Sequence, residues 1–357
     1  MAQLLVNLSF LMAKPTGLAI YGSNLAPHLT PLDPVLLSPL AHPGHRVHRV
    51  PGNMTPQQGS KGHARRLWWT QRALPSLSRS YGSRLLFSPI PEAPLGTGDR
   101  FVVTVHDFIA RRFSKSTSPL GLYTRYYVPH VLQQAVQVIT NSEATARDAV
   151  QFCGLDARKI TPIPLAYDAE HFRELGLPTE PYFLYLGRHD PHKNLARILA
   201  AFAQIADLDC ELWLAGTPDE RFTPQLKAQA AEYGLTERLR FLDYVPYDQL
   251  PVIINQAIAL VFPSLWEGFG LPVLEAMACG TPVVTSNISA LPEVAGDAAL
   301  LVNPYETLEI AAAMQTIAVD CSARAQLKRA GLARARRFSW QQTGKQTRDV
   351  LRRALEA

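Results

Sequence analysis

Residues 259–280 read ALVFPSLWEGFGLPVLEAMACG. The first four residues of this stretch form a continuous apolar run of the kind that is buried on both faces of a parallel sheet. Pro272 suits the first position of a helix, and Gly280 suits the position just past its end. The stretch therefore predicts a buried strand, a glycine-rich turn and a short helix, which is a unit of an α/β fold.

The same alternation continues on both sides of this stretch and predicts βαβ units with parallel sheets and right-handed crossovers. In the second half, strands are predicted at 182–186, 211–215, 239–242 and 259–262, with helices near 195–205, 224–233 and 248–256. In the first half, strands are predicted at 4–10, 101–105 and 137–140, with helices at 17–29, near 122–136 and after Ser142. Residues 40–100 are rich in Pro, Gly, Arg and Ser, and no element is assigned there.

The length of 357 residues exceeds the size at which one hydrophobic core usually stops growing. We therefore expect a Rossmann-like domain over 1–165, a proline-containing linker over 166–180 and a second Rossmann-like domain over 181–340. A final helix over 341–357 is expected to pack back on the first domain. In open sheets of this kind, ligands bind at the carboxyl ends of the strands.

Composition favours a folded cytoplasmic protein. The four cysteines are far apart and form neither a CxxC pair nor a disulfide framework, so we expect reduced thiols. The first apolar stretch resembles a buried strand more than a signal peptide. No apolar run approaches the roughly 20 residues that cross a bilayer.

Two glutamates flank the glycine-rich turn. Glu267 lies in the loop and Glu275 in the first turns of the following helix, and each carboxylate can accept two hydrogen bonds from a vicinal diol such as a sugar or ribose. The glycines and the helix N-terminus favour a phosphate nearby. One glutamate alone is more often a solvated surface charge, but the pair around this turn indicates a binding site.

Two cations follow an earlier buried strand, in the segment 187–194 that reads GRHDPHKN. Arg188 and Lys193 would lie at the carboxyl edge of the sheet, where charge-assisted hydrogen bonds can hold a diphosphate. Either cation alone is as often an ordinary surface charge. Together with the glutamates they point to a nucleotide-sugar site.

At this point the sequence resembles the retaining glycosyltransferases of family 4, which share the GT-B fold. The resemblance covers about residues 180–300. It rests on the E-x7-E pattern, the GR…KN loop, the strand end Ala215-Gly216 and the segment ALPEV at 290–294. It implies an α/β fold of two Rossmann-like domains whose parallel sheets face each other across a cleft.

The resemblance also implies a role for each site residue. Glu267 would contact the donor hexose and Glu275 the nucleotide ribose. Arg188 and Lys193 would bind the diphosphate. Further donor contacts would come from the backbone of Phe269, Gly270 and Leu271 and, less specifically, from Val245 after the strand at 239–242.

The first half resembles the family less closely. His106, after the strand at 101–105, resembles the family's histidine beside the donor sugar, although a buried structural histidine is the alternative. Gly17 resembles the glycine loop that faces the diphosphate, but its surroundings at 14–19 depart from the paired glycines of many members. The acceptor is expected on this domain.

The implied reaction transfers a hexose from a nucleoside diphosphate sugar to a hydroxyl of a glycan or lipid-linked acceptor, with retention of configuration. No metal or other cofactor is expected, because the DLD triplet at 207–209 precedes a strand and does not follow one.

The context of His106 resembles bacterial mannosyltransferases of cell-surface polysaccharides, which makes mannose the leading sugar. The alternatives are another GT-B enzyme, such as a phosphorylase or nucleotide-sugar epimerase, and a catalytically silent sugar-nucleotide-binding protein.

The charge is uneven along the chain. Residues 1–170 hold 17 Lys and Arg against 9 Asp and Glu, whereas the rest holds 18 against 21. No stacking-aromatic motif or recognition helix supports a nucleic-acid partner. The stretch 61–84 combines five arginines with aromatic side chains, which suits peripheral contact with an anionic membrane at its inner face. A stretch packed on its own domain is the alternative. The residues in question are Arg65, Arg66, Arg72, Arg79, Arg84, Trp68, Trp69 and Tyr81.

Overall fold

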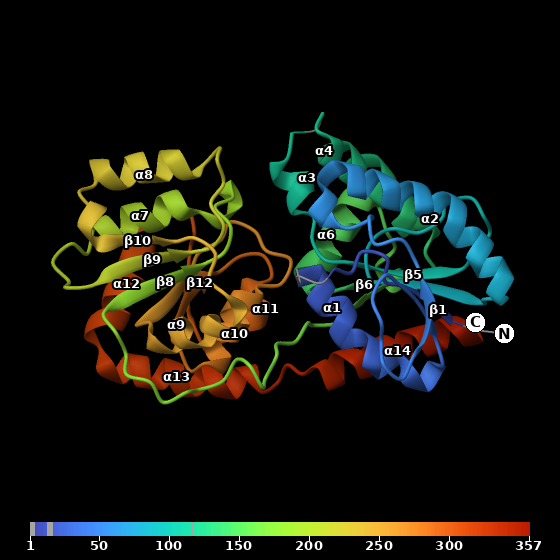
Figure 1. The fold of residues 1–357 in the computed structure, drawn as a ribbon. Helices are drawn as coiled ribbons and strands as arrows, with labels where there is room; N and C mark the ends of the chain where they lie inside the picture. Colours follow the sequence, from blue (N-terminus) through green and yellow to red (C-terminus); the bar gives the residue numbers. More distant parts are fainter. Residues whose placement is uncertain (1–3, 13–16, 116) are drawn as a thin grey trace. The chain divides into compact units, whose positions relative to one another are not determined.

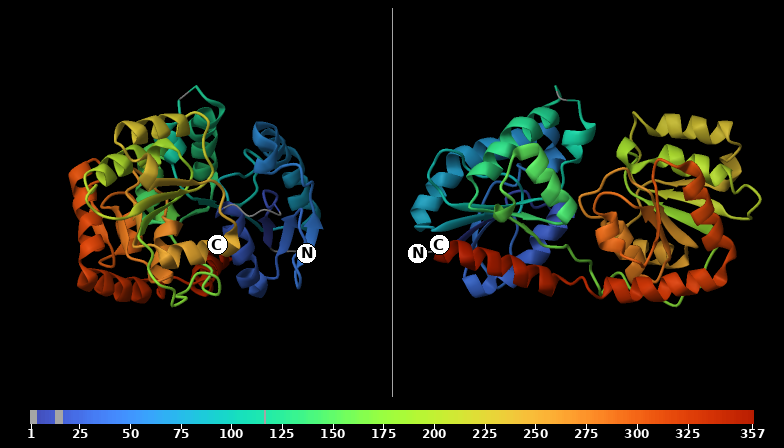
Figure 2. Two further views of the ribbon diagram at one scale, coloured as in Figure 1. Left: turned by 60° about the vertical axis from the view of Figure 1, so that its left-hand side comes forward. Right: turned by 180° about the vertical axis from the view of Figure 1, so that it is seen from behind.

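The computed structural model describes residues 4–12, 17–115 and 117–357. The chain divides into two compact units, which we call the N-terminal unit (Met1–Leu165 with Trp340–Ala357) and the C-terminal unit (Ala166–Ser339). Each unit has a parallel sheet with helices on both faces (Figure 1). Figure 2 shows the same layers in each unit from two other sides. The predicted α/β fold class is confirmed.

The sheet of the N-terminal unit has the strand order β3-β2-β1-β4-β5-β6-β7, and every neighbouring pair is parallel. Its first strand ends at Asn7, three residues earlier than predicted, because the chain turns there. The strands are β1 (Leu4–Asn7), β2 (Val35–Ser38), β3 (Arg46–Arg49), β4 (Leu85–Ser88), β5 (Phe101–Val105), β6 (Gln137–Thr140) and β7 (Ile160–Pro162).

Helices α1 and α14 cover one face of this sheet, and α2, α5 and α6 cover the other (Figure 1). Helix α2 lies in the region where the sequence assigned no element. It ends at Tyr81 and is followed by Gly82, whose φ of 59° suits a left-handed C-cap. The helices are α1 (Gly17–Leu25), α2 (Gly59–Tyr81), α3 (Ile109–Phe113), α4 (Pro119–Leu122), α5 (Val128–Gln134), α6 (Glu143–Cys153) and α14 (Trp340–Glu356); the short helical turns are η1 (Ala26–Leu32), η2 (Pro56–Gln58), η3 (Tyr123–Tyr127) and η4 (Ala157–Lys159).

The sheet of the C-terminal unit has the order β10-β9-β8-β11-β12-β13 and is also parallel throughout. The four strands predicted in this half have the predicted bounds, whereas the last two were not assigned from the sequence. The strands are β8 (Tyr182–Leu186), β9 (Glu211–Ala215), β10 (Leu239–Leu242), β11 (Ala259–Phe262), β12 (Val283–Ser286) and β13 (Leu300–Val302).

The core of the C-terminal unit forms where apolar helix faces cover these buried strands. Ile198 and Phe202 of α7, for example, are fully buried. The helices are α7 (Leu195–Ala203), α8 (Thr223–Glu232), α9 (Leu250–Gln256), α10 (Leu271–Ala278), α11 (Leu291–Ala295), α12 (Thr307–Val319) and α13 (Cys321–Ala335); the short turns are η5 (Pro191–Lys193), η6 (Thr236–Arg238) and η7 (Tyr247–Gln249).

Each sheet has one point at which the strand order reverses. In the C-terminal unit β8 and β11 are neighbours, and the chain adds strands outward from them in both directions. In the N-terminal unit β1 and β4 have the same relation. The loops after the carboxyl ends of two such neighbouring strands run in opposite directions. They leave a crevice between them in which ligands bind. The GRHDPHKN loop follows β8 and the glutamate loop follows β11.

Candidate functional site

The two loops at the reversal point of the C-terminal unit are tied to each other. The backbone N–H of Leu265 donates to the carbonyl of His192 at 2.7 Å. Asn194 donates from its amide to the carbonyls of Pro263 at 2.9 Å and Pro304 at 2.7 Å. Asn194 has a φ of 65°, a conformation that Asn tolerates better than most residues. These bonds fix the loop after β8 against the loop after β11.

The structure brings Lys193 and Glu267 together. The Lys193 Nζ lies 2.7 Å from the Glu267 Oε1, and the two side chains are 16% and 9% exposed. The same ammonium lies 4.9 Å from the centre of the Phe262 ring, a cation–π contact at the end of β11. A nearly buried ion pair thus lies at the carboxyl edge of the sheet.

A serine that the sequence did not identify supports the glutamate loop. The backbone N–H of Glu267 donates to the Ser289 Oγ at 3.2 Å. Ser289 has a φ of 60°, which costs energy for a residue with a side chain and is often found at functional sites. No spacing rule reveals this contact, because it depends on the path of the loop after β12.

Glu275 lies on α10, one turn from its start. The helix begins after Gly270, whose φ of 112° would strain any residue with a side chain and where a Cβ would lie 2.7 Å from the Leu291 Cδ2. Glu275 is half-buried, and the burial of its carboxyl raises its pKa to about 7. This carboxyl therefore titrates near neutral pH.

Arg188 is placed differently from Lys193. Its side chain is 66% exposed and lies 3.4 Å from the Asp190 carboxylate and 3.9 Å from that of Asp219. The carbonyl of Arg188 accepts a hydrogen bond from the Tyr185 hydroxyl at 2.7 Å, which holds the backbone in place. The guanidinium can therefore move while its backbone stays at the end of β8.

The remaining candidate donor-binding residues differ in how deeply they are buried. Phe269 is buried, and its ring packs against that of Phe338 with centres 6.0 Å apart. Leu271 opens α10 and is half-buried. Val245 follows β10 and is half-buried.

His106 follows β5 in the N-terminal unit. Its Nε2 lies 2.9 Å from the Pro89 carbonyl oxygen, which can only accept a hydrogen bond, so Nε2 carries the proton and Nδ1 is the acceptor. The ring packs edge-on against Tyr21, with centres 4.8 Å apart. Burial lowers the pKa of His106 to about 4, so the imidazole is neutral at pH 7.

Gly17 is the first residue of α1 and is exposed. The residues before it, 13–16, lie outside the described part of the chain, so the structure describes only part of the expected glycine loop.

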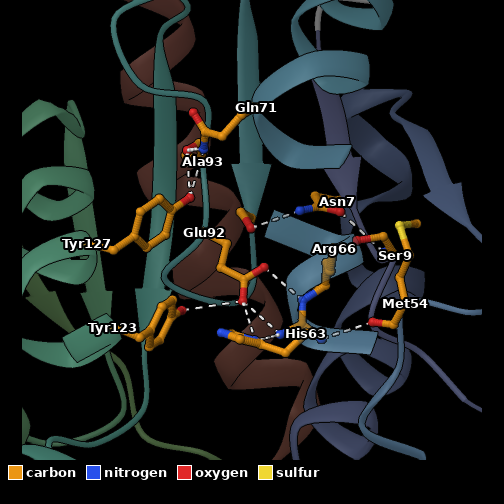
Figure 3. Close-up of polar contacts among 11 residues, drawn as sticks. Asn7, Ser9, Met54, His63, Arg66, Gln71, Glu92, Ala93, Tyr123 and Tyr127 are labelled. Carbon is orange, nitrogen blue, oxygen red and sulfur yellow. Dashed lines mark hydrogen bonds and ion pairs between the residues drawn. The ribbon is translucent and has the colours of Figure 1, made fainter. Parts of the chain in front are cut away.

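The basic stretch of the N-terminal unit does not lie on one surface as the sequence suggested. Arg66 and Trp69 face inward and are 8% and 7% exposed, whereas Trp68 is 67% exposed. Figure 3 shows Arg66 pointing toward Glu92 beside the end of β4. Arg66 and Trp69 therefore do not contribute to the surface of α2, because the helix has one inward and one outward face.

Two family profiles match almost the whole chain in sequence. Residues 17–171 match the family described as Glycosyltransferase Family 4. Residues 168–334 match the family described as Glycosyl transferases group 1.

Curated relatives share about a third of their residues with the matched part of the chain. The O-antigen chain mannosyltransferase B of Escherichia coli is 33% identical over 232 residues, which is 60% of this chain and 60% of that protein. The D-inositol 3-phosphate glycosyltransferase of Nocardia farcinica is 32% identical over 235 residues, which is 60% of this chain and 51% of that protein. The matches thus span three fifths or less of these relatives.

Solved structures share the fold at low sequence identity. Sucrose-phosphate synthase from Thermosynechococcus elongatus superposes with a TM-score of 0.77 at 22% identity and covers 98% of both chains. Anabaena HepE, solved in complex with UDP and glucose, superposes with a TM-score of 0.75 at 19% identity, over 98% of this chain and 99% of that chain. With its two profile matches and two parallel α/β sheets, the chain belongs to the family 4 glycosyltransferases of the GT-B fold.

Proposed function

We propose that the protein is a retaining glycosyltransferase that moves a hexose, with mannose the leading candidate, from a nucleoside diphosphate sugar to a hydroxyl of a glycan or lipid-linked acceptor. The observation that carries the proposal is the Lys193–Glu267 pair at the carboxyl ends of β8 and β11. It combines a cation for a diphosphate with a carboxylate for sugar hydroxyls at the reversal point of the sheet. The mannosyltransferase relatives support the choice of sugar.

The difficulty of the reaction is the negative charge that develops on the departing nucleoside diphosphate. Fixed positive groups aimed at that charge usually make the largest contribution to catalysis, and loss of one costs on the order of 10²–10³ in rate. Lys193 has three N–H donors, so it can keep Glu267 and also donate to a phosphate oxygen. Arg188 and the N-terminus of α10 would add positive charge, so we propose that no metal is required.

The other candidate residues would bind the sugar, the ribose and the base of the donor. Glu267 would accept hydrogen bonds from hexose hydroxyls, and Glu275 from the ribose diol. His106, with a free acceptor at Nδ1, would bind a hydroxyl of the transferred sugar. Phe269, Gly270 and Leu271 would contact the donor through their backbone, and Val245 would contact the base.

Thermal unfolding with a panel of nucleotide sugars tests donor binding directly. A donor at 100 times its Kd should add about 2.7 kcal/mol to the free energy of unfolding. Lys193→Ala should remove the protection, and Lys328→Ala, which changes a half-exposed lysine elsewhere in the C-terminal unit, should keep it. Absence of protection by every donor would refute the proposal.

Product analysis tests the chemistry. NMR of the product should show the anomeric configuration of the donor sugar, and transfer should continue in EDTA. Inverted product would contradict the retaining mechanism. Activity lost in EDTA and restored by Mn²⁺ would contradict metal independence.

We also propose that the N-terminal unit binds an anionic membrane surface through one face of α2. No Asp or Glu occurs in Gly59–Tyr81, and the outward face carries cations around the exposed Trp68. Each cation near an anionic leaflet contributes about 1 kcal/mol, and amphipathic aromatic side chains suit the headgroup region. In the described part of the chain, no helix is long and apolar enough to span a bilayer. The outward residues are Lys61, Arg65, Trp68, Arg72 and Arg79.

Liposome flotation tests this contact. The protein should float with anionic vesicles at low salt and lose binding with neutral vesicles or high salt. Arg65→Glu with Arg72→Glu should abolish flotation. Lys345→Glu with Arg353→Glu makes the same charge change on exposed positions of α14 and should leave flotation intact. Equal behaviour of the two variants would contradict a specific α2 surface.

A further inference from the structure

The segment that follows β4 carries the partner of His106. It runs Pro89-Ile90-Pro91-Glu92-Ala93, and all of it except Pro91 is buried. Its first residue supplies the carbonyl that accepts the His106 Nε2–H at 2.9 Å. The position of this carbonyl therefore decides which nitrogen of His106 carries the proton.

A buried ion pair holds the other end of this segment. The Glu92 carboxylate accepts two hydrogen bonds from Arg66 of α2, from Nε and from Nη2, both at 2.7 Å. It accepts a third from the Tyr123 hydroxyl of η3 at 3.3 Å. Glu92 is 1% exposed and Arg66 8%. Figure 3 shows these side chains converging beside the end of β4.

The next residue is held from the same two elements. The Ala93 carbonyl accepts hydrogen bonds from the Gln71 amide of α2 at 2.9 Å and from the Tyr127 hydroxyl of η3 at 3.0 Å. The Gln71 carbonyl oxygen in turn accepts from the backbone N–H of Leu95 at 3.0 Å. Side chains of α2 and η3 thus fix the segment over several successive residues (Figure 3).

The free-energy cost of burying the Arg66–Glu92 ion pair indicates that the pair positions the segment after β4 more than it stabilises the fold. Desolvating two charges is expensive, and buried pairs can often be replaced by apolar side chains without loss of stability. Arg66 is also fully engaged, because its Nη1 donates to the Met54 carbonyl at 3.0 Å and its Nη2 lies 2.9 Å from the His63 Nδ1. Bidentate geometry fixes direction as well as distance.

We propose that Arg66 and Glu92 are positioning residues for His106: they hold the segment after β4 so that the Pro89 carbonyl takes the Nε2–H and leaves Nδ1 as the acceptor. Tyr123, Tyr127 and Gln71 complete this clamp. The inference deepens the proposed function, and only its kinetic part rests on that function. The state of the imidazole can be measured without any substrate.

The test reads the tautomer by ¹⁵N NMR of histidine-labelled protein at pH 7, with His106→Gln identifying the His106 signals among those of the ten histidines. The wild type should show His106 as the Nε2–H tautomer alone. Arg66→Met combined with Glu92→Leu removes both charges and should give a mixture of tautomers. Its kcat should fall about 10- to 100-fold, the range seen when partners that orient metal-bound histidines are removed, while the donor KM stays near its wild-type value.

A second double variant, with smaller changes, keeps the test decisive if the variant without Arg66 and Glu92 fails to fold. Tyr123→Phe combined with Tyr127→Phe removes two hydroxyls from the clamp and should shift the tautomer in the same direction. Tyr81→Phe is the matched control, because its hydroxyl bonds His48 and not the segment after β4. A wild type with Nδ1–H, or a folded clamp variant that keeps the pure Nε2–H tautomer, would overturn the inference. A changed tautomer with unchanged transfer would support the clamp and reject the assignment of His106 to the reaction.

Discussion

At Gly216, which follows β9, a Cβ atom would lie 1.9 Å from the carbonyl oxygen of Gly187. The two glycines have φ values of 151° and 148°, in the region that favours glycine. Gly187 begins the loop that carries Arg188 and Lys193, so the close approach of two backbones sets where that loop leaves the sheet.

Gly216→Ala should therefore lower the free energy of unfolding by about 3 kcal/mol, through backbone overpacking and an unfavourable φ. Gly234→Ala is the control, because Gly234 also has a positive φ, of 67°, but open space around its Cβ position. It should cost about 1 kcal/mol. Urea denaturation of both variants measures the difference, and equal costs would show that the close approach relaxes freely.

Under the proposed role of Glu275 in donor binding, its pKa links the stability of the fold to the affinity for the donor. Burial raises the pKa of Glu275 in the folded protein from its ordinary value of about 4.5 to about 7. A raised pKa gives stability that is complete below about pH 4.5 and is lost as the pH rises through about 7. The loss amounts to at most about 3 kcal/mol.

Glu275→Gln should abolish this pH dependence, so the variant should be more stable than the wild type at pH 8 and similar at pH 4.5. Donor affinity should rise between pH 6 and 8 in the wild type, because the ionised carboxylate accepts more strongly from a ribose diol. The variant should bind weakly at every pH in this range. Thermal unfolding and calorimetric titration across the range check both effects, and a pH-independent wild type would contradict them.

Features of the fold and site could be predicted from the sequence where the interacting residues lie close together along the chain, and were missed where they lie far apart. The places of the loops that carry Glu267 and Lys193 could be predicted, because each loop follows an apolar strand within a few residues. Helix α2 was missed because its inward face carries Arg66 and Gln71, whose burial is compensated by Glu92 and Ala93 more than 20 residues away. Pro75 inside the helix obscured it further. Ser289 was missed because its contact with Glu267 spans two loops.

The inward and outward faces of α2 should respond differently to substitution of a tryptophan. Trp69→Ala should lower the free energy of unfolding by about 3–5 kcal/mol, because Trp69 lies in the core of the N-terminal unit. Trp68→Ala, one residue earlier on the exposed face, should change it by no more than about 0.5 kcal/mol. Only the second variant should fold normally and bind anionic vesicles more weakly. Similar losses of stability would mean that Trp68 also packs on the unit.

At the scale of the whole molecule, the last helix completes the N-terminal unit although it follows the C-terminal unit in sequence. Helix α14 buries Val350, Leu351 and Leu355 against this unit. Arg100 donates to the Ala354 carbonyl at 2.8 Å, which ties the helix end to the residue before β5. Burial of three large aliphatic side chains contributes roughly 5–8 kcal/mol, comparable with the total stability of an ordinary domain.

Disturbing α14 should therefore destabilise the N-terminal unit and spare the C-terminal unit. At Gly344 an added Cβ would lie 2.2 Å from the Cβ of His28, so Gly344→Ala pushes α14 away from η1, whereas Gly52→Ala has space and serves as the control. Differential scanning calorimetry should show two transitions in the wild type, of which Gly344→Ala lowers one. The other transition belongs to the C-terminal unit; it should not move, and under the proposed function a nucleoside diphosphate should stabilise it. One transition that shifts as a whole would show instead that the two sheets unfold together and that α14 stabilises the entire chain.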